Sequence, residues 1–165
     1  MESVNIRDVE QKDISDVQKY ISEPSLSDMS NIPSPYPENG AEIWFNHVQS
    51  LISENRARIF VIELGKEFAG VIAMNALSLH ESKANFDYWV RLDLQGEGIA
   101  SKALGFAVEE AKRMGLKTLY SGCLVRNVAS QRVLKNNGFS PYRVIKLADG
   151  KHVGEELVQM SKTST

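Results

Sequence analysis

A short glycine-containing segment, Gln95–Ala100, has the residues in this chain that most clearly suggest chemistry. Gly96 and Gly98 allow the backbone to turn tightly and to approach a ligand without a Cβ clash. Aromatic and β-branched residues at 86–90 precede the segment, and apolar residues at three- and four-residue spacing follow it over 104–114. A strand, a glycine turn and a helix start place unpaired backbone amides at the positive end of a helix dipole. This pattern predicts an anion-binding loop of the kind that holds phosphates.

Two other interpretations of the glycines are open. They also suit an ordinary tight connection between a strand and a helix. They also begin the G-x-G of a dinucleotide-binding turn, which requires an acidic residue at the end of the next strand. The strand predicted over 118–125 is instead followed by Arg126, and the glycines lie past the middle of the chain. The sequence therefore argues against the dinucleotide-binding interpretation.

A second block of polar residues follows the predicted strand at 118–125. Residues 127–134 read N-x-x-S-x-x-V-L and lead into Asn137-Gly138-Phe139. Asn127 is a preferred helix N-cap, and Ser130, three residues later, shares its helix face. Together, the Q-x-x-G-x-A and N-x-x-S-x-x-V-L…G-F blocks resemble the GNAT N-acetyltransferase superfamily. The residues in these two blocks are most similar to those of the RimJ/RimL-type branch, which includes ribosomal-protein N-terminal acetyltransferases.

This resemblance implies a cofactor and a reaction. Acetyl-coenzyme A would be the donor, with its pantetheine arm in a gap between two parallel strands, and a primary amine would attack it directly. A protein or peptide N-terminal α-amine is the preferred acceptor, and a polyamine or aminoglycoside-like antibiotic is the alternative. A non-catalytic acyl-coenzyme A binding module is a further alternative. The implied cofactor-binding residues are Trp89, Val90, Arg91, Gln95, Gly96, Glu97, Gly98, Ile99, Ala100, Ser101, Asn127, Ser130 and Arg132.

Several of these residues also have purely structural explanations. Trp89 suits a packed core as well as a cofactor contact. Gln95 suits a role in ordering the glycine loop, and Arg132 suits a solvated surface. Asn127 can cap its helix and bind the pantetheine arm at once.

The resemblance also implies where a proton donor would lie. Ser130 would be near the coenzyme sulfur and would donate a proton to the departing thiolate. Many relatives carry a tyrosine for this purpose one helical turn later, where this chain has Leu134. Ser130 is therefore the predicted acid.

The base that many relatives use is missing from its expected place. The relatives' strand A-E-I-G-Y-W-L corresponds to residues 84–90, so Asn85 replaces Glu, and an amide cannot accept the proton. Asp87 shares the strand face of Asn85, so both are predicted to line the acceptor site, and Asp87 is the candidate to replace the missing base. Tyr36, in a proline-rich loop, is also predicted to line that site. Further carboxylate candidates are Glu155 and Glu156.

The remaining reactive side chains suggest no additional chemistry. Cys123 is the single cysteine, so it cannot form an internal disulfide, and it is predicted to be a buried structural thiol. His47, His80 and His152 lack metal-ligand spacing, so no metal site is predicted.

Composition limits the class of protein. The chain has 165 residues, 42% hydrophobic and 24% charged, which predicts one domain over 1–165 with an ordinary core. A net charge of −2 gives no support for a nucleic-acid partner. The longest apolar run, 68–74, is too short to span a bilayer, and no leader opens the chain. We therefore expect a cytoplasmic monomer or homodimer without membrane attachment.

The predicted elements follow the order β-α-α-β-β-β-α-β-α-β-β. The resemblance implies an α/β GNAT fold with four helices and a mixed, mostly antiparallel seven-stranded sheet, in which a central parallel pair is splayed. Predicted strands are 4–7, 58–64, 67–77, 84–90, 118–125, 139–147 and 151–160, and predicted helices begin at Asp13, near Ala41, after Gly98 and at Asn127. The four prolines in 23–40 predict an irregular loop, and 161–165 is predicted to be a frayed tail.

Overall fold

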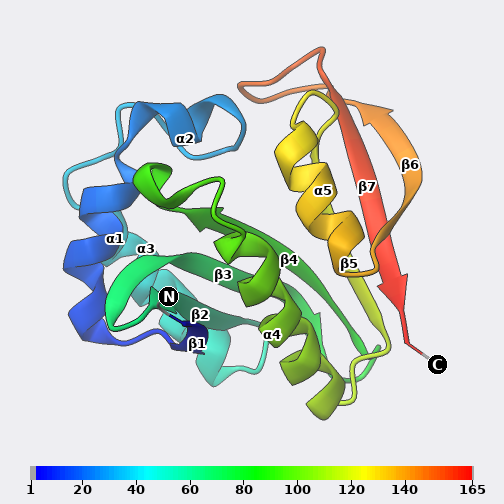
Figure 1. Cartoon of the computed structure of the whole chain (residues 1–165), viewed down its shortest axis with the longest axis horizontal. Coiled ribbons are helices and arrows are strands. Elements are labelled where there is room, and N and C mark those ends of the chain that lie inside the picture. Colours follow the sequence, from blue (N-terminus) through cyan, green and yellow to red (C-terminus); the bar gives the residue numbers. More distant parts are fainter. Residues whose placement is uncertain (1–2, 165) are drawn as a thin grey trace.

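The computed structural model describes residues 3–164 and contains one seven-stranded sheet (Figure 1). The elements in chain order are β1 (Val4–Asp8), α1 (Ile14–Ile21), α2 (Pro24–Asp28), α3 (Gly40–Ser53), β2 (Arg58–Leu64), β3 (Glu67–Ser78), β4 (Lys83–Val90), α4 (Ile99–Arg113), β5 (Thr118–Leu124), α5 (Val128–Asn136), β6 (Ser140–Lys146) and β7 (Glu156–Thr163). The sheet order is β1-β2-β3-β4-β5-β7-β6. Only the β4–β5 pair is parallel. The predicted element order is thus confirmed, with one short helix added.

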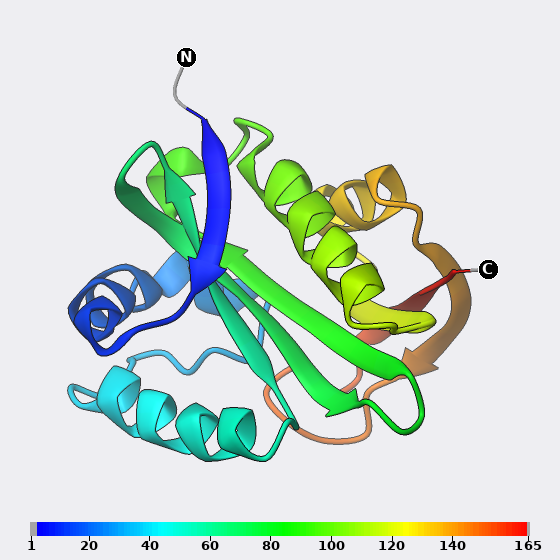
Figure 2. The same cartoon turned by 90° about the horizontal axis from the view of Figure 1, so that it is seen from below.

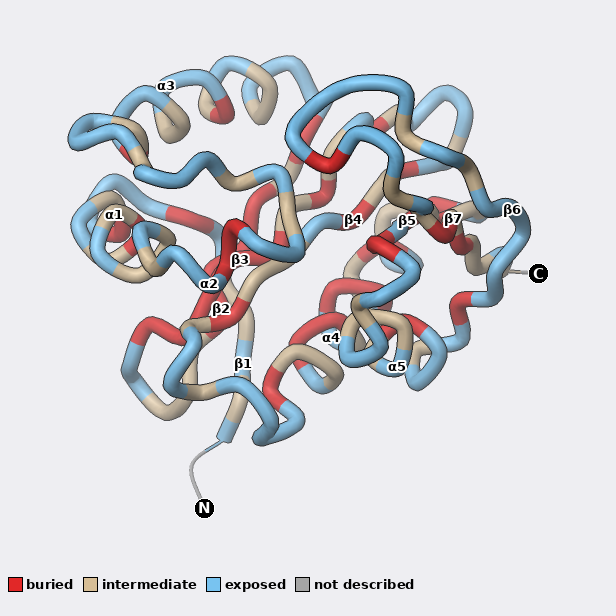
Figure 3. The backbone as a smooth tube through the Cα atoms, turned by 90° about the horizontal axis from the view of Figure 1, so that it is seen from above, coloured by how far each residue is buried: buried red, intermediate tan, exposed pale blue. Residues whose placement is uncertain are grey.

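Alternation along the strands divides the buried residues between two faces of the sheet. One core includes Phe60, Ile62 and Phe86 and is covered by α4 and α5. The other includes Ile59 and Val61 and is covered by α1 and α3. Figure 2 shows the two helix groups on opposite sides of the strands, and Figure 3 shows the buried backbone along the strands and the inner helix faces. Neighbouring residues of a strand therefore face different helix layers.

The proline-rich segment contains a helix that the sequence analysis missed. Residues 24–28 form α2, with Pro24 at its start and the Glu23 side chain accepting a hydrogen bond from the Ser25 amide. Proline is tolerated at the first helical position because the amide of that residue has no helical partner. The rest of the segment is irregular, as predicted.

The prediction for the C-terminal hairpin was wrong at both ends of its last strand. Residues 151–154 belong to a turn, and β7 begins only at Glu156. Residues 161–163 are strand and not tail, because Ser161 pairs with Ser140 and with Tyr120 on the two sides of β7. Thr165 lies outside the described residues.

The prediction for the inward face of α3, which helical spacing assigns to Ile43, Trp44, His47, Leu51 and Ile52, was wrong in part. Ile43 and His47, predicted to lie near the buried face, are exposed, whereas Ala41 and Val48 are buried. Trp44, Leu51 and Ile52 pack against the core as expected. Among the described residues, none of the helices has the length and apolar character needed to cross a membrane.

A buried ion pair joins the first strand to the start of α1. Asp13 accepts hydrogen bonds from Arg7 at 2.7 and 2.9 Å and from the Glu10 amide at 2.7 Å. Burial alone would raise the pKa of the Asp13 carboxyl, but the bonds from Arg7 and the Glu10 amide outweigh burial and hold that pKa below its usual value. Ionised Asp13 therefore stabilises this junction.

We expect Asp13→Asn to lower the free energy of unfolding by about 2 kcal/mol at neutral pH, because a charge-assisted bond to Arg7 is lost. A carboxyl whose pKa is lower in the folded state stabilises the fold above its unfolded pKa, and this contribution is lost as pH falls through the folded pKa. Below about pH 4 the variant should thus lose stability less steeply than the wild type. Urea titrations across pH measure both effects. Glu54→Gln, at an exposed pair with Arg56, is the control and should cost little.

Candidate functional site

A gap opens between the two central strands. β4 and β5 pair only from Lys83 with Thr118 to Asn85 with Tyr120, although both strands continue beyond that point. At the start of the gap, the buried Ser121 hydroxyl donates to the Phe86 carbonyl at 2.8 Å. A side chain thus replaces the next bond of the ladder, and the strands separate beyond it.

Backbone groups of β4 line the gap. Since the Phe86 carbonyl faces β5 and backbone direction alternates along a strand, Tyr88 and Val90 also present their amide and carbonyl groups to the gap. The Arg91 amide faces the other way and donates to Ala69 of β3. The Val90 amide is therefore directed into the gap, whereas the Val90 carbonyl accepts a hydrogen bond from Gln95 Nε2 at 3.2 Å.

The glycine loop ends in an uncapped helix. Gly96 and Gly98 have φ angles of 83° and 77°, and a Cβ at either position would meet no atom within 4 Å. Glycine is thus required by the backbone conformation, not by a lack of space. Gly98 has no side-chain capping bond, and the first turn of α4 has no acidic residue. The amides of residues 99–101 therefore remain available to an anion.

The second sequence block forms the other wall of the gap. Asn127 caps α5, because its Oδ1 accepts from the Ser130 amide at 3.1 Å. At the other end of α5, Asn137 Nδ2 donates to the Ser101 carbonyl at 3.0 Å. The helix of the second block is thereby fixed against the first turn of α4. The predicted cap is confirmed.

Three side chains with reactive hydrogens meet between β4, β5 and α5. The Tyr88 and Ser130 hydroxyl oxygens are 2.6 Å apart. Burial raises the pKa of the Tyr88 phenol to about 12, although its bond with Ser130 opposes the rise. Burial also raises the pKa of the Cys123 thiol, which the neighbouring Ser130 hydroxyl partly counteracts. Cys123 is buried, as predicted, and is a neutral thiol at physiological pH.

Asp87 lies on the opposite face of β4 from Tyr88. Its Oδ2 accepts hydrogen bonds from Asn75 at 2.9 Å and from Asn85 at 3.4 Å. All three side chains belong to an exposed surface. Asn85 and Asp87 thus share a face, as predicted, and form a polar patch with one carboxylate.

Several predicted cofactor residues point away from the gap. The Arg91 guanidinium stacks over Tyr20 of α1 and pairs with Asp93 at 2.6 Å. Trp89 packs against Phe68 in the core beneath α1 and α3. The Ile99 side chain is buried in the other core, so only its backbone faces the loop. These three side chains have structural roles in the chain.

The other predicted residues lie at the surface or in the second core. Glu97 and Arg132 are exposed, and Ala100 is half-buried. Tyr36 packs near Gly40 in the core of α1 and α3, where burial raises the pKa of its phenol.

Glu155 and Glu156, the further carboxylate candidates, lie where the β6–β7 turn enters β7. Glu155 is paired with Arg126 at 2.6 Å, and this bond, joined by one from His152, holds the pKa of the carboxyl below its usual value. Glu156 is exposed.

The α2 segment and the β6–β7 turn lie close together at the end of the molecule where β4 and β5 separate (Figure 1). Polar contacts join the segments at this end. Arg126, after β5, donates to the Asp28 carbonyl of α2 at 2.9 Å. From the β6–β7 turn, Lys151 donates to Ser27, and His152 contacts the Ser30 carbonyl at 2.9 Å. The α2 segment and the β6–β7 turn, distant in sequence, are therefore held together.

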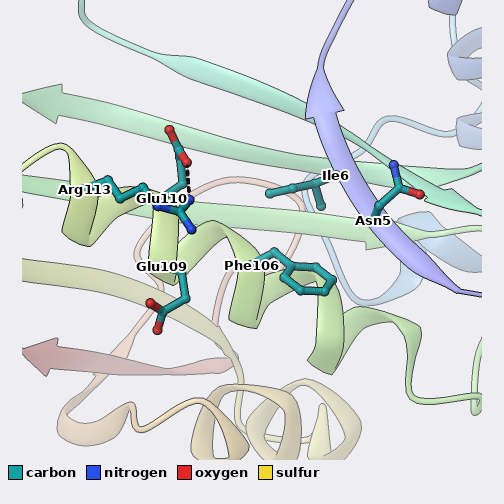
Figure 4. Close-up of a pocket in the computed structure, with 6 residues that line it drawn as sticks. All are labelled: Asn5, Ile6, Phe106, Glu109, Glu110 and Arg113. Atoms are coloured by element: carbon teal, nitrogen blue, oxygen red, sulfur yellow. Dashed lines mark hydrogen bonds and ion pairs between the residues drawn. The ribbon is translucent and has the colours of Figure 1, made fainter.

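A cavity of about 450 Å³ lies elsewhere, between β1 and α4 (Figure 4). Its lining residues are Asn5, Ile6, Phe106, Glu109, Glu110 and Arg113. None of them is a predicted site residue. Within residues 3–164, no group of three or more His, Cys, Asp or Glu side chains is arranged to hold a metal ion.

The sequence analysis missed Tyr88 and Ser121. Strand alternation would have placed Tyr88 with Phe86 and Val90, on the face opposite Asp87. No sequence signal reveals that Ser121 ends the ladder, because that depends on where the strands separate.

We expect Cys123 to react slowly with iodoacetamide, because the thiolate is the nucleophile and the buried thiol has a raised pKa. Native protein at mildly alkaline pH should be alkylated at least about tenfold more slowly than a free thiol. Mass spectrometry gives an unambiguous reading since the chain has one cysteine. Protein in denaturant is the control and should react fully. Equal rates in native and denatured protein would contradict the burial and pKa.

Comparisons with known proteins agree with this architecture. The family model described as "Acetyltransferase (GNAT) domain" matches residues 3–140. The chain is 32% identical over 94 residues to the ribosomal-protein-serine acetyltransferase of Escherichia coli (strain K12). That match covers 56% of this chain and 52% of the relative, so it spans about half the relative's length.

Two solved structures share the fold. A ribosomal α-N-protein acetyltransferase, RimL, in complex with coenzyme A has a TM-score of 0.89 at 20% identity, covering 98% of this chain and 94% of its own. Spermidine N-acetyltransferase from Vibrio cholerae, in complex with coenzyme A and spermine, has a TM-score of 0.84 at 18% identity, covering 97% and 95%. With the family match over most of its length, the chain belongs to the GNAT acetyltransferase family.

Proposed function

We propose that this protein is an N-acetyltransferase that moves an acetyl group from acetyl-coenzyme A to a primary amine. The observation that carries the proposal is the gap between β4 and β5, with open helix amides at one end and Ser130 on its wall. A thioester arm fits such a gap, because the backbone groups of Tyr88 and Val90 that face it lack a strand partner in β5. The family match over residues 3–140 supports the same reaction.

Acetyl-coenzyme A would supply an activated acetyl thioester, and this chain's residues would position it. The amides of residues 99–101 would hold the pyrophosphate at the positive end of α4. Backbone groups of Tyr88 and Val90 would fix the arm, and the Asn127 side-chain amide would bind it from the α5 side. Catalysis would come from orientation and from fixed donors aimed at developing charge.

Direct attack by the amine is favoured over an acyl-enzyme. An acyl-cysteine route needs a thiolate, whereas burial raises the pKa of Cys123. An acyl-serine route needs a base beside Ser130, whereas the hydrogen-bond partner of the Ser130 hydroxyl is the protonated Tyr88 phenol. Ser130 would instead donate a hydrogen bond to the departing sulfur.

A protein or peptide N-terminal α-amine is the acceptor that the geometry supports best. The patch on the acceptor side offers one carboxylate, Asp87, flanked by the amides of Asn75 and Asn85. One carboxylate suits one ammonium, whereas a polyamine with several cations calls for several carboxylates. The match to a ribosomal-protein-serine acetyltransferase points the same way.

The missing strand glutamate also favours an α-amine. The pKa of an α-amino group is about 8, so a useful fraction is unprotonated near neutral pH without a strong base. A lysine or polyamine amine, with a pKa of about 10, needs more help. Water would accept the proton, and Asp87 would attract the ammonium form.

A polyamine acceptor is the second candidate, because a spermidine N-acetyltransferase shares this fold. We further propose that the protein acts in the cytoplasm, where acetyl-coenzyme A and nascent or ribosomal proteins are available. It would act as a monomer or homodimer and without nucleic acid.

An acceptor screen with purified protein tests the function. Peptides with free N-termini, the same peptides N-acetylated but with a lysine, and spermidine would be compared by thiol release. Release with the free N-termini alone would support the proposal, and release with spermidine alone would favour the second candidate.

We predict that Gly98→Val weakens coenzyme A binding at least about tenfold. Only glycine adopts the Gly98 φ angle of 77° readily, so valine would add strain of about 1–2 kcal/mol and displace the phosphate-binding amides. Calorimetry measures the dissociation constant. Gly115→Val is the matched control, because Gly115 has a φ angle of 80° and open space at the other end of α4. Equal losses in both variants would indicate general destabilisation, and no binding to the wild type would contradict the proposed function.

We predict that Asp87→Asn raises the KM for a cationic acceptor severalfold and leaves the shape of the pH–kcat profile unchanged. The reason is that Asp87 attracts the ammonium while water takes the proton. Steady-state rates across pH on the best acceptor measure both quantities. Asp149→Asn, an exposed carboxylate in the β6–β7 turn, is the control. Loss of an ionisation limb near neutral pH with unchanged acceptor binding would show that Asp87 is the base.

A further inference from the structure

Tyr88 and Ser130 meet across the gap from opposite walls. Tyr88 belongs to β4 and Ser130 to α5, and their hydroxyl oxygens are 2.6 Å apart. This distance is at the short end for O–H···O bonds, so one hydroxyl donates to the other. Beyond Ser121, this bond joins the two walls where the strands no longer pair.

The direction of this bond follows from the chemistry of the two hydroxyls. A phenol is a better donor and a poorer acceptor than an alcohol, because its oxygen lone pair is delocalised into the ring. Tyr88 therefore donates to Ser130 Oγ. Burial raises the pKa of Tyr88 to about 12, so the phenol keeps its hydrogen at any physiological pH. The alternative acceptor for Tyr88, the Ser130 carbonyl, is more distant at 3.4 Å.

This direction determines what Ser130 can do. A serine hydroxyl has one hydrogen and two lone pairs. With one lone pair taken by Tyr88, the single hydrogen of Ser130 is free to point away from Tyr88, toward another acceptor.

We infer that Tyr88 is a positioning residue for acetyl transfer, directing the one hydrogen of Ser130 at the departing coenzyme A sulfur. This inference rests on the proposed function. It also accounts for Leu134, which is fully buried in the core at the position where many relatives carry a tyrosine. The phenol is supplied from strand β4 and acts through a serine.

The step balances without any further reactant. The amine nitrogen bonds to the acetyl carbon, the carbon–sulfur bond breaks, and its electron pair stays on sulfur. Hydrogen bonds from Ser130, and from Tyr88 to Ser130, stabilise that charge. The pKa of an alkyl thiol is about 8.5, so the phenol is too weak an acid to protonate the thiolate fully. The amine nitrogen releases one proton to water as the amide forms, the thiolate takes up that proton from the solvent, and both hydroxyls keep theirs.

The first test is a double-mutant cycle with Tyr88→Phe and Ser130→Ala. We expect Tyr88→Phe to lower kcat about tenfold and to leave the KM for acetyl-coenzyme A within about twofold. Ser130→Ala should lower kcat about a hundredfold, because it removes a hydrogen-bond donor aimed at the developing negative charge. Tyr88→Phe should have no further effect in the Ser130→Ala background, because its target is gone. Tyr120→Phe, a half-buried tyrosine of β5, is the control and should retain activity. Equal losses in both backgrounds would overturn the inference.

The second test needs no acceptor. Coenzyme A is bound to the Cys123→Ala protein, and the ultraviolet absorbance of its thiolate is followed across pH. Bound coenzyme A should have a thiol pKa below that of free coenzyme A. Tyr88→Phe should raise the bound value by at least about half a unit, and Ser130→Ala should raise it at least as much. Added to Ser130→Ala, Tyr88→Phe should cause no further shift.

These measurements separate the inference from the proposed function. If coenzyme A binds but Tyr88→Phe leaves the bound thiol pKa unchanged, the role of Tyr88 is wrong, whereas the proposed function stands. If the unsubstituted protein does not bind coenzyme A, the proposed function fails, and the inference fails with it. Thermal unfolding of Tyr88→Phe monitors the fold. A loss of kcat that simply follows a loss of folded protein would contradict the positioning role.

Discussion

The separation of β4 from β5 is the constraint on which the rest of this structure depends. Two central strands can part only if each is held from its other side. β4 pairs with β3 from Lys83 to Val90, and β5 pairs with β7 along its whole length. The gap therefore costs only the bonds between β4 and β5, and it leaves backbone groups of Tyr88 and Val90 directed at a ligand. A continuous ladder would have no such groups to offer.

The alternation of β4 gives the gap two chemically different sides. Asp87 and Asn85 are exposed on one face, whereas the neighbouring Tyr88 is directed to the face of α5 and Ser130. In acetyl transfer the amine attacks one face of the planar thioester carbonyl, and the sulfur then leaves the same carbon as a separate substituent. One strand can thus place a carboxylate near the amine and a hydroxyl pair near the sulfur, without a flexible loop to bring them together.

Local rules account for the parts of the site that sequence could predict. Gly98 was expected in a tight turn, where the structure gives it a φ angle of 77°, and Asn127 was expected as a cap; both depend on residues near in sequence. The direction of the Arg91 side chain could not be predicted, because it is set by contacts of the guanidinium with Tyr20 and Asp93, which hold it away from the gap. Tyr88 was overlooked because its proposed role depends on a hydrogen bond with Ser130, which lies 42 positions away in the sequence. Contacts between distant segments, such as those of α2 with the β6–β7 turn, likewise could not be predicted, because sequence periodicity reports only on local structure.

Two missing residues, the strand glutamate and the helix tyrosine of relatives, are the only argument for a non-catalytic module. The structure weakens both halves of that argument. A phenol is present in the gap, supplied by β4 in place of α5. A strong base is needed only where the acceptor amine is mostly protonated, and an α-amine near neutral pH is not such an acceptor. The absence of glutamate therefore restricts the choice of acceptor more than it argues against catalysis. A chain that merely held coenzyme A would have no need of a half-buried hydroxyl pair beside the expected position of the sulfur.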